Sequence, residues 1–255
     1  MRYQGSKRSM MKSLKRLIES NLGKCKAYVE PFGGGMNAFA AVDHPNKIAA
    51  DINSYVIAMW KGIQNGTFII PESVSEIEYK SMKEDCLSKG GKYDSALLGY
   101  VGNACSNGCG WWNGYAHFNP KKNEDHIAEA RRGLIKHINS FIGLDNCQFV
   151  NSDYRSLNYP DNSFIYCDPP YASTKGYNKD GFDNELFWEW CREMVDKGHK
   201  VMVSEYTAPS DFVCIWEKAR KDGMGTTKEG GIQNTKVERV FVHKSQLRKF
   251  KKICN

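Results

Sequence analysis

The segment from Lys26 to Asn53 limits the fold of this chain more than any other. An apolar run, "AYVE", leads into the loop "PFGGG", and a helix-like stretch, "MNAFAAV", precedes a second apolar run that ends at Asp51. A strand, a glycine loop, a helix and a second strand in this order form the βαβ pattern of a nucleotide-binding half-sheet. The sequence therefore predicts an open α/β sheet with ligand sites at the carboxyl ends of its strands.

Strand patterns return only after residue 146. The four clearest are "CQFVNSD", "SFIYCDPPY", "KVMVSEY" and "VERVFVHK", with the helical pattern "NELFWEWCREMVDKG" between the second and the third. Before them, the sequence indicates two helices, "SEIEYKSMKEDCLSKG" and "EDHIAEARRGLIKHINSFI", around a glycine- and aromatic-rich centre. We therefore predict a core in two parts, residues 1–60 and 146–255, with a mostly helical insert at residues 61–145.

The composition is that of a soluble globular protein. Of the 255 residues, 41% are hydrophobic and 25% are charged, and no apolar run approaches the length of a membrane span. The basic N-terminal segment lacks the apolar core of a signal peptide, so we expect a cytoplasmic protein. The net charge of +7 moderately favours a polyanionic partner.

The nine cysteines do not predict a disulfide framework. Their number is odd and the expected compartment is intracellular, so we expect free thiols. Cys105 and Cys109 with His117 and His126 form a group that suggests zinc. Their spacing lacks the paired two-residue gap of a structural zinc site, so we expect no metal.

The glycines at residues 33–35 and the acid Asp51 indicate a nucleoside-type ligand. Adjacent glycines let the backbone turn tightly and approach a ligand closely, although a plain turn would also use them. Asp51 ends the next strand, where a carboxylate can accept hydrogen bonds from both hydroxyls of a ribose. The loop does not match the Walker pattern, which favours a ligand without phosphates.

The stretch "DPPY" offers hydrogen-bond acceptors beside an aromatic ring. Asp168 follows an apolar strand pattern, and its ionised carboxylate only accepts hydrogen bonds. Pro169 and Pro170 have carbonyl oxygens but no N–H, and Tyr171 adds a flat face for stacking. Such a corner suits a planar group that carries an amine, such as adenine. An ordinary turn after a buried strand explains the four residues equally well.

Several motifs in order carry a resemblance to a known family. They are "RYQGSKRSMMKSL", "YVEPFGGGMN", "AADIN", "NSDYRSL", "YCDPPY" and "GHKVMVSEY". This set resembles the Dam-like (alpha-type) DNA adenine-N6 methyltransferases, in which the glycine motif comes first, a target-recognition insert second and DPPY last. The resemblance is weakest between residues 65 and 145, and Gly34 stands where many members have a hydrophobic or small residue. It implies a Rossmann-like, S-adenosylmethionine-dependent methyltransferase sheet with an inserted recognition domain.

The resemblance assigns a set of residues to S-adenosylmethionine. Tyr3 and Lys7 would close over the cofactor, and its methionine part would be lined by Phe32, Gly33, Gly34 and Gly35. Asp51 would hold the ribose. Asp153, with Tyr154 packed alongside, would accept a hydrogen bond from the adenine amine, and Asp168 borders the same site.

The resemblance also assigns the catalytic corner. Asp168, Pro169, Pro170 and Tyr171 would hold a target adenine that is flipped out of double-stranded DNA. Its amine would attack the sulfonium methyl in line, with Asp168 orienting the amine and no metal required. The implied protein is a monomer, with a dimer possible on DNA. It would act in bacterial cytoplasm, encoded by the host or by a phage, in restriction–modification or in regulation.

Alternatives remain at three points. The same corner could serve cytosine, RNA adenine or a protein glutamine, but cytosine enzymes commonly carry Ser and glutamine-modifying relatives Asn in place of Asp168. A non-catalytic nucleic-acid-binding module could keep the fold. The segment around Lys121 and Lys122 could contact DNA, or it could be a glycine-rich hairpin that packs on neighbouring helices.

Overall fold

The computed structural model describes residues 10–170, 182–221 and 235–251. In these residues, seven strands form one sheet in the order β3-β2-β1-β4-β5-β7-β6. The order β3-β2-β1-β4-β5 is that of Rossmann-like doubly wound sheets, and the chain order reverses between β1 and β4. The predicted α/β fold is therefore confirmed. The chain divides into two compact units, one with residues 1–11 and 31–157 and the other with residues 12–30 and 158–255.

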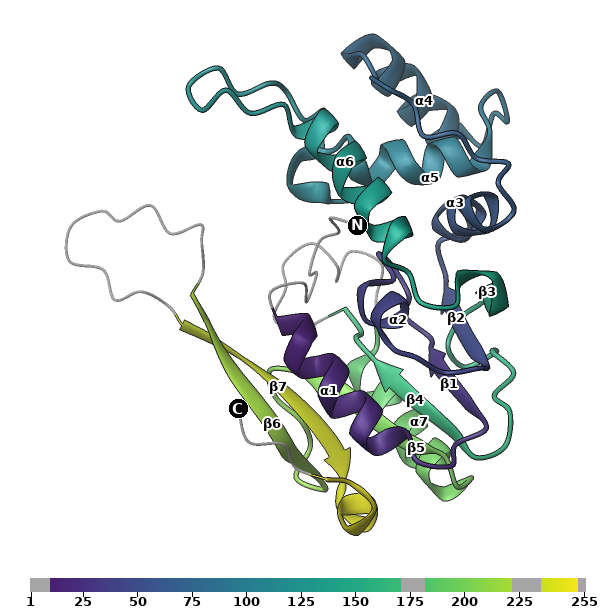
Figure 1. Ribbon diagram of the computed structural model, residues 1–255, viewed down its shortest axis with the longest axis vertical. Helices are drawn as coiled ribbons and strands as arrows, with labels where there is room; N and C mark the ends of the chain where they lie inside the picture. The colour runs from purple at the N-terminus through teal and green to yellow at the C-terminus, as the bar shows by residue number, and fades with distance from the viewer. Residues whose placement is uncertain (1–9, 171–181, 222–234, 252–255) are drawn as a thin grey trace, which may run out of the picture. The chain divides into compact units, whose positions relative to one another are not determined.

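The first unit contains strands β2 and β3 and most of the helices (Figure 1). The strands run parallel, with Lys47 beside Cys147 at one end and Asp51 beside Asn151 at the other. Helix α5 packs against α3, α4 and α6. The bounds are α2 (Asn37–Ala41), β2 (Lys47–Asp51), α3 (Ser54–Gln64), α4 (Glu76–Ser88), α5 (Ser95–Ala104), η2 (Asn107–Cys109), α6 (His126–Asn139), η3 (Leu144–Asn146) and β3 (Cys147–Asn151).

Side-chain caps explain where the longer helices of this unit begin. Asn53 accepts hydrogen bonds from the N–H groups at the start of α3, and Asp94 and Asp125 do the same for α5 and α6. Ser75 and Glu78 form a reciprocal capping box at the start of α4. Each cap satisfies N–H groups that have no acceptor inside the helix, so the four starts are encoded locally.

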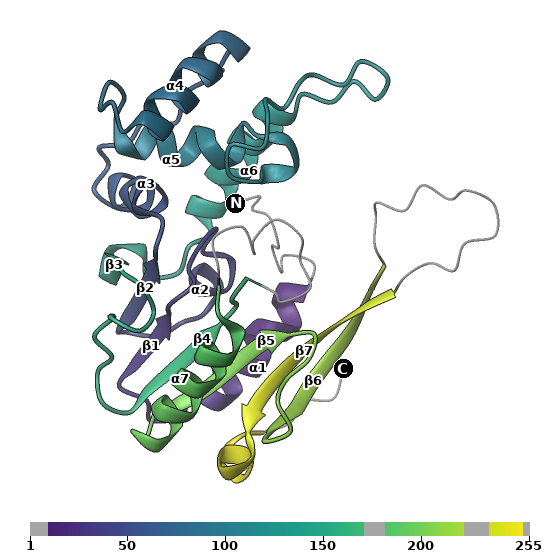
Figure 2. The same ribbon diagram turned by 180° about the vertical axis from the view of Figure 1, so that it is seen from behind.

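The second unit contains the other five strands. Strands β1, β4 and β5 are parallel, and β7 runs antiparallel to both β5 and β6. Helix α1 lies over one face of this part of the sheet and α7 over the other (Figures 1 and 2), so every residue of β4 is buried. The bounds are α1 (Met11–Leu22), β1 (Ala27–Glu30), β4 (Ser163–Cys167), α7 (Asn184–Asp196), β5 (Lys200–Glu205), β6 (Phe212–Lys221), β7 (Thr235–His243) and η5 (Lys244–Lys249).

The strands expected from the sequence correspond to β1, β2, β3, β4, β5 and β7, while β6, α3 and α5 are additional. Between residues 61 and 145 the described chain has helices and two isolated bridges but no strand, as expected. The helices α4 to α6 belong to the same compact unit as β2 and β3. The boundaries of an inserted domain at residues 61–145 stay a prediction. No described helix has the length and apolar character needed to cross a membrane.

Candidate active site

Several of the predicted site residues lie at the carboxyl ends of the parallel strands, where sheets of this kind bind ligands. The glycine loop follows β1, Asp51 ends β2, Asp153 follows β3, and Asp168 follows β4. The loop, Asp51 and Asp153 lie in the first unit, and Asp168 with its two prolines lies in the second.

Three hydrogen bonds hold the glycine loop against its surroundings. The Gly33 N–H donates to the Ala50 carbonyl at 2.7 Å, and the Gly34 N–H donates to Asp51 Oδ2 at 2.8 Å. The indole N–H of Trp60 donates to the Gly34 carbonyl at 3.2 Å. Gly34 has φ +46°, in the left-handed region that favours glycine. The loop therefore has one defined path along the end of β2.

Asp51 combines a structural role with spare acceptor capacity. Its Oδ1 accepts from the Asn53 N–H at 2.8 Å, and its Oδ2 accepts from Gly34. An ionised carboxylate has about four acceptor positions, so about two remain for a ligand. Burial raises the pKa of Asp51 above its ordinary value, and the two backbone hydrogen bonds oppose that shift. The carboxylate of Asp51 thus has acceptor capacity left for hydroxyl groups, and its role at a ribose stays a prediction.

Ile52 is a residue that the sequence interpretation did not assign. Its side chain is 74% exposed, directly after Asp51 at the end of β2. Asn151 Nδ2 donates to the carbonyls of both Asp51 and Ile52, at 2.9 and 3.0 Å, which fixes the backbone of this corner. A large apolar residue directly after a strand-ending acid is the sequence signal that could have indicated Ile52 as an exposed residue of the candidate site.

Phe32 and Tyr154 form an aromatic pair beside the predicted adenine acceptor. Their ring centroids are 5.2 Å apart, so the structure brings these two predicted residues together. Asp153 accepts from Arg155 Nε at 2.8 Å, from Arg155 Nη2 at 3.0 Å and from the Arg155 N–H at 2.9 Å. These hydrogen bonds hold the pKa of Asp153 below its ordinary value. Asp153 is therefore ionised and oriented, and Arg155 is a further residue that the sequence interpretation missed.

The corner after β4 is partly buried in the second unit. Pro169 is buried, and Asp168 and Pro170 are half-buried. The two residues before Asp168, Tyr166 and Cys167, are at most 1% exposed. Tyr166 shares a hydrogen bond of 2.7 Å with Ser204 on the neighbouring strand β5. Burial, with a smaller contribution from the charge of Asp168, raises the pKa of Tyr166 well above its ordinary value. Asp168 thus follows two buried residues. The hydroxyl of Tyr166 stays neutral because its pKa is raised.

Glu30 is a buried acid of this unit to which the sequence analysis gave no role. It ends β1, the parallel neighbour of β4, and is only 4% exposed. The Tyr28 hydroxyl donates a hydrogen bond to Glu30 Oε1. The sequence shows Glu30 directly before the glycine loop, but only the pairing of β1 with β4 shows that it lies on the strand next to the one that leads to Asp168.

The structure does not describe every predicted site residue. Tyr3, Lys7 and Tyr171 lie outside the described residues. Lys121 and Lys122 are exposed, within a loop closed by a bridge between Asn119 and Glu124. In the described ranges, no three His, Cys, Asp or Glu side chains form a group that could hold a metal ion.

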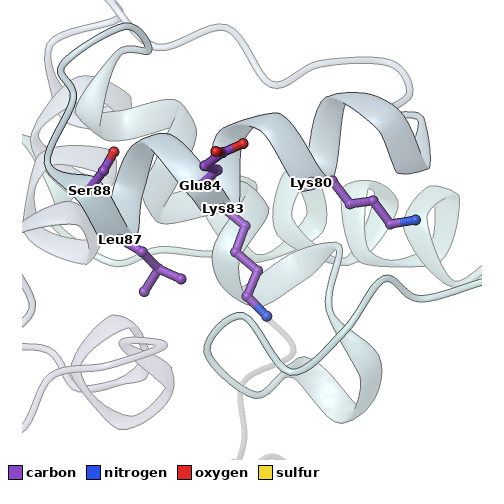
Figure 3. Close-up of a pocket in the computed structure, with 5 residues that line it drawn as sticks. All are labelled: Lys80, Lys83, Glu84, Leu87 and Ser88. Carbon is purple, nitrogen blue, oxygen red and sulfur yellow. The ribbon is translucent and has the colours of Figure 1, made fainter.

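The structure also has a hollow along α4 (Figure 3). It is lined by Lys80, Lys83, Glu84, Leu87 and Ser88 of that one helix. Lys80 pairs with Glu76 at 2.8 Å, and Lys83 Nζ donates to the Trp112 carbonyl at 2.9 Å. Since both ammonium groups already bind the protein and no second element lines the hollow, we assign it no ligand.

Comparison with known proteins identifies a family. The family model of the D12 class N6 adenine-specific DNA methyltransferases matches residues 3–222. The chain is 27% identical over 210 residues to the Type II methyltransferase M.FokI of Planomicrobium okeanokoites, covering 75% of this chain and 31% of that protein. It is 28% identical over 187 residues to the DNA adenine methylase of Escherichia coli K12, covering 68% of this chain and 64% of that protein. It is 25% identical over 235 residues to the retron Ec67 DNA adenine methylase of Escherichia coli, covering 80% and 75%. The matched segment thus spans less than two thirds of the first two relatives.

Proposed function

Because this chain belongs to the D12 class N6 adenine-specific DNA methyltransferases, we propose that it is a site-specific enzyme acting on double-stranded DNA. It transfers a methyl group from S-adenosylmethionine to the N6 amine of adenine. The observation that carries this proposal is the corner after β4, where Asp168, Pro169 and Pro170 follow a buried strand at the reversal of the sheet order. This position and the acceptor groups favour an amine-binding corner over an ordinary turn.

The residues of the first unit fit S-adenosylmethionine. Asp51 keeps acceptor positions for the two ribose hydroxyls, while the glycine loop that it anchors runs beside the amino-acid part. Asp153 keeps about one acceptor position, because Arg155 uses three of about four. That position suits one hydrogen of the adenine amine, with Phe32 and Tyr154 as aromatic neighbours. When bound, the cofactor supplies the electrophilic methyl group.

At the corner, Asp168 and the Pro169 carbonyl accept the two hydrogens of the target amine. Two acceptors favour a pyramidal nitrogen, whose lone pair is then available for in-line attack. The carboxylate of Asp168 stabilises the positive charge that develops on nitrogen, and the proton is lost after transfer. The amine of a paired adenine lies inside the duplex, so the base must first be flipped out, with Tyr171 as its stacking partner.

We further propose that the helical segment around residues 61–145 reads the DNA, with Lys121 and Lys122 at phosphates. The enzyme would need no metal and act as a monomer in the cytoplasm, with a dimer possible on DNA. A non-catalytic module is the second candidate, since a fold of this kind can bind nucleic acid without transferring a group.

Tritiated S-adenosylmethionine tests the proposal against these alternatives. The purified protein is incubated with plasmid DNA, with total RNA and with a protein extract in parallel. We expect label in DNA alone. Label only in RNA or in protein would contradict the proposed substrate, and binding of DNA without any transfer would favour the non-catalytic module.

A further inference from the structure

Trp60 reaches the cofactor loop from helix α3, although it lies far from the loop in sequence. Its side chain is completely buried, and its indole N–H donates to the Gly34 carbonyl at 3.2 Å. The Gly34 N–H is held separately by Asp51 Oδ2 at 2.8 Å. Gly34 is therefore fixed through both of its peptide groups, one by an acid that faces the ligand and the other by a buried ring.

The second of these hydrogen bonds also determines where the Gly35 N–H points. The Gly34 carbonyl and the Gly35 N–H belong to one planar peptide group, and no described peptide bond is cis. In a trans peptide the C=O and the N–H point in opposite directions. Since the carbonyl points at Trp60 in the core, the Gly35 N–H points away from Trp60.

The ring of Trp60 has little freedom to move. It stacks on Phe149 of β3 with ring centroids 6.1 Å apart and an interplanar angle of 20°. His137 of α6 and Phe141 contact it at tilted or edge-on angles, with centroids 5.6 and 5.8 Å away. A donor held on three sides keeps one direction, so the peptide that it binds is preorganised before a ligand arrives.

We propose that Trp60 is a positioning residue that aims the Gly35 N–H at the carboxylate of the amino-acid part of S-adenosylmethionine. The inference rests on the proposed function, because it takes the glycine loop as the site of that part of the cofactor. An N–H donor that is aimed in advance binds a carboxylate without the cost of rotating the peptide. A glycine-rich turn has no side chains of its own to fix its peptides, so the donor must come from elsewhere.

Two ligands and one substitution test the role of Trp60. S-adenosylhomocysteine has the carboxylate, and 5′-methylthioadenosine lacks the amino-acid part altogether. Trp60→Phe keeps an aromatic ring but removes the N–H. By isothermal titration calorimetry, we expect this variant to bind S-adenosylhomocysteine about fivefold more weakly than the wild type, as for loss of one net hydrogen bond. Its affinity for 5′-methylthioadenosine should be unchanged.

Trp112→Phe is the matched control. Trp112 is also buried in the first unit, and its indole N–H donates to Cys86 Sγ rather than to the glycine loop. It should bind both ligands as the wild type does. Should Trp60→Phe fail to fold, benzothienylalanine at position 60 keeps the ring shape without the N–H and takes its place.

Two outcomes would overturn the inference while leaving the proposed function intact: equal loss of affinity for both ligands, or no loss for either. A wild-type protein that binds no S-adenosylhomocysteine would overturn the proposed function and this inference with it.

Discussion

The carboxylate of Asp51 accepts hydrogen bonds from two backbone N–H groups and still has acceptor positions left for a ligand. It holds Gly34 and Asn53 through one oxygen each, and its neighbour Asn151 fixes the carbonyls of Asp51 and Ile52. Burial would favour the neutral acid, whereas two backbone donors favour the carboxylate. Because the net effect raises the pKa of Asp51, the group titrates closer to neutral pH than an ordinary aspartate does.

This pKa predicts how cofactor binding depends on pH. Only the ionised carboxylate accepts from the two ribose hydroxyls while it also holds Gly34 and Asn53. The affinity for S-adenosylhomocysteine should therefore fall as the pH falls through the raised pKa of Asp51. Asp51→Asn should bind more weakly at pH 7 and lose most of that pH dependence. Titration calorimetry from pH 4.5 to pH 8 measures both effects, and an identical pH profile in the variant would remove Asp51 from the ribose site.

The raised pKa has the opposite consequence for the stability of the free protein. An acid whose folded pKa lies above its unfolded value is protonated more readily in the folded state. Its ionisation costs stability at pH values above the folded pKa, and this cost diminishes as the pH falls from the folded to the unfolded pKa and is absent below the unfolded value. In the absence of ligand, Asp51→Asn should thus lose no more stability at neutral pH than its two backbone hydrogen bonds account for.

Three secondary-structure elements, β6, α5 and α3, were missed by sequence patterns, because their residues are determined by tertiary contacts rather than by a local pattern. Strand β6 has a register irregularity between Cys214 and Trp216, which interrupts the alternation by which strands are found. Helix α5 contains Gly99 and Gly102, which lower helix propensity. Helix α3 carries a short apolar run, of which five residues are buried, and such a run cannot be told from a strand by its pattern alone.

The glycines of α5 show why propensity fails there. A Cβ on Gly99 would overlap the Tyr55 carbonyl oxygen of α3, and one on Gly102 would lie 2.5 Å from the Trp111 ring. The glycines are needed so that α5 can approach its neighbours, which a local reading of the sequence cannot detect.

Gly99→Ala should therefore destabilise the protein by about 1–3 kcal/mol, the usual cost of forcing an extra carbon into a packed interior. Urea unfolding followed by circular dichroism measures the change. Gly133→Ala in α6 is the control, because a Cβ there meets nothing within 4 Å. It should be neutral or should stabilise the protein by about 0.4–1 kcal/mol. Similar midpoints for the two variants would argue against close packing of α3 and α5.

The candidate site was predictable from sequence where a chemical group directly follows a strand. Asp51 and Asp168 could be singled out because each ends or follows an apolar strand pattern, whereas Asp153 was assigned through the resemblance carried by "NSDYRSL". Trp60 and Glu30 could not, because their places depend on a long-range hydrogen bond and on the pairing of β1 with β4. Sequence motifs thus point to the acids of the candidate site but not to the groups that hold or accompany them.

At the scale of the whole molecule, the excess positive charge predicts how DNA binding responds to salt. Each lysine that contacts a phosphate releases a counterion, so affinity falls with salt concentration on a double logarithmic plot. If Lys121 and Lys122 contact phosphates, Lys121→Ala with Lys122→Ala should make that slope shallower by about 2, without changing the affinity for S-adenosylhomocysteine. Fluorescence anisotropy with a labelled duplex at several salt concentrations measures the slope.

A second double variant separates local contact from net charge. Arg248→Ala with Lys249→Ala removes two equally exposed charges near the end of the described chain. Its slope should stay close to that of the wild type. Equal effects in the two double variants would mean that total charge, rather than the loop at residues 119–124, governs DNA binding.

The central claim is that this enzyme methylates the N6 amine of adenine in DNA and that Asp168 positions that amine. Mass spectrometry of nucleosides from plasmid DNA, after incubation with S-adenosylmethionine, tests both parts together. We predict N6-methyladenine from the wild type, and none from Asp168→Ala although that variant still binds S-adenosylhomocysteine. Methylcytosine as the product, or N6-methyladenine formed at an undiminished rate by Asp168→Ala, would contradict the account.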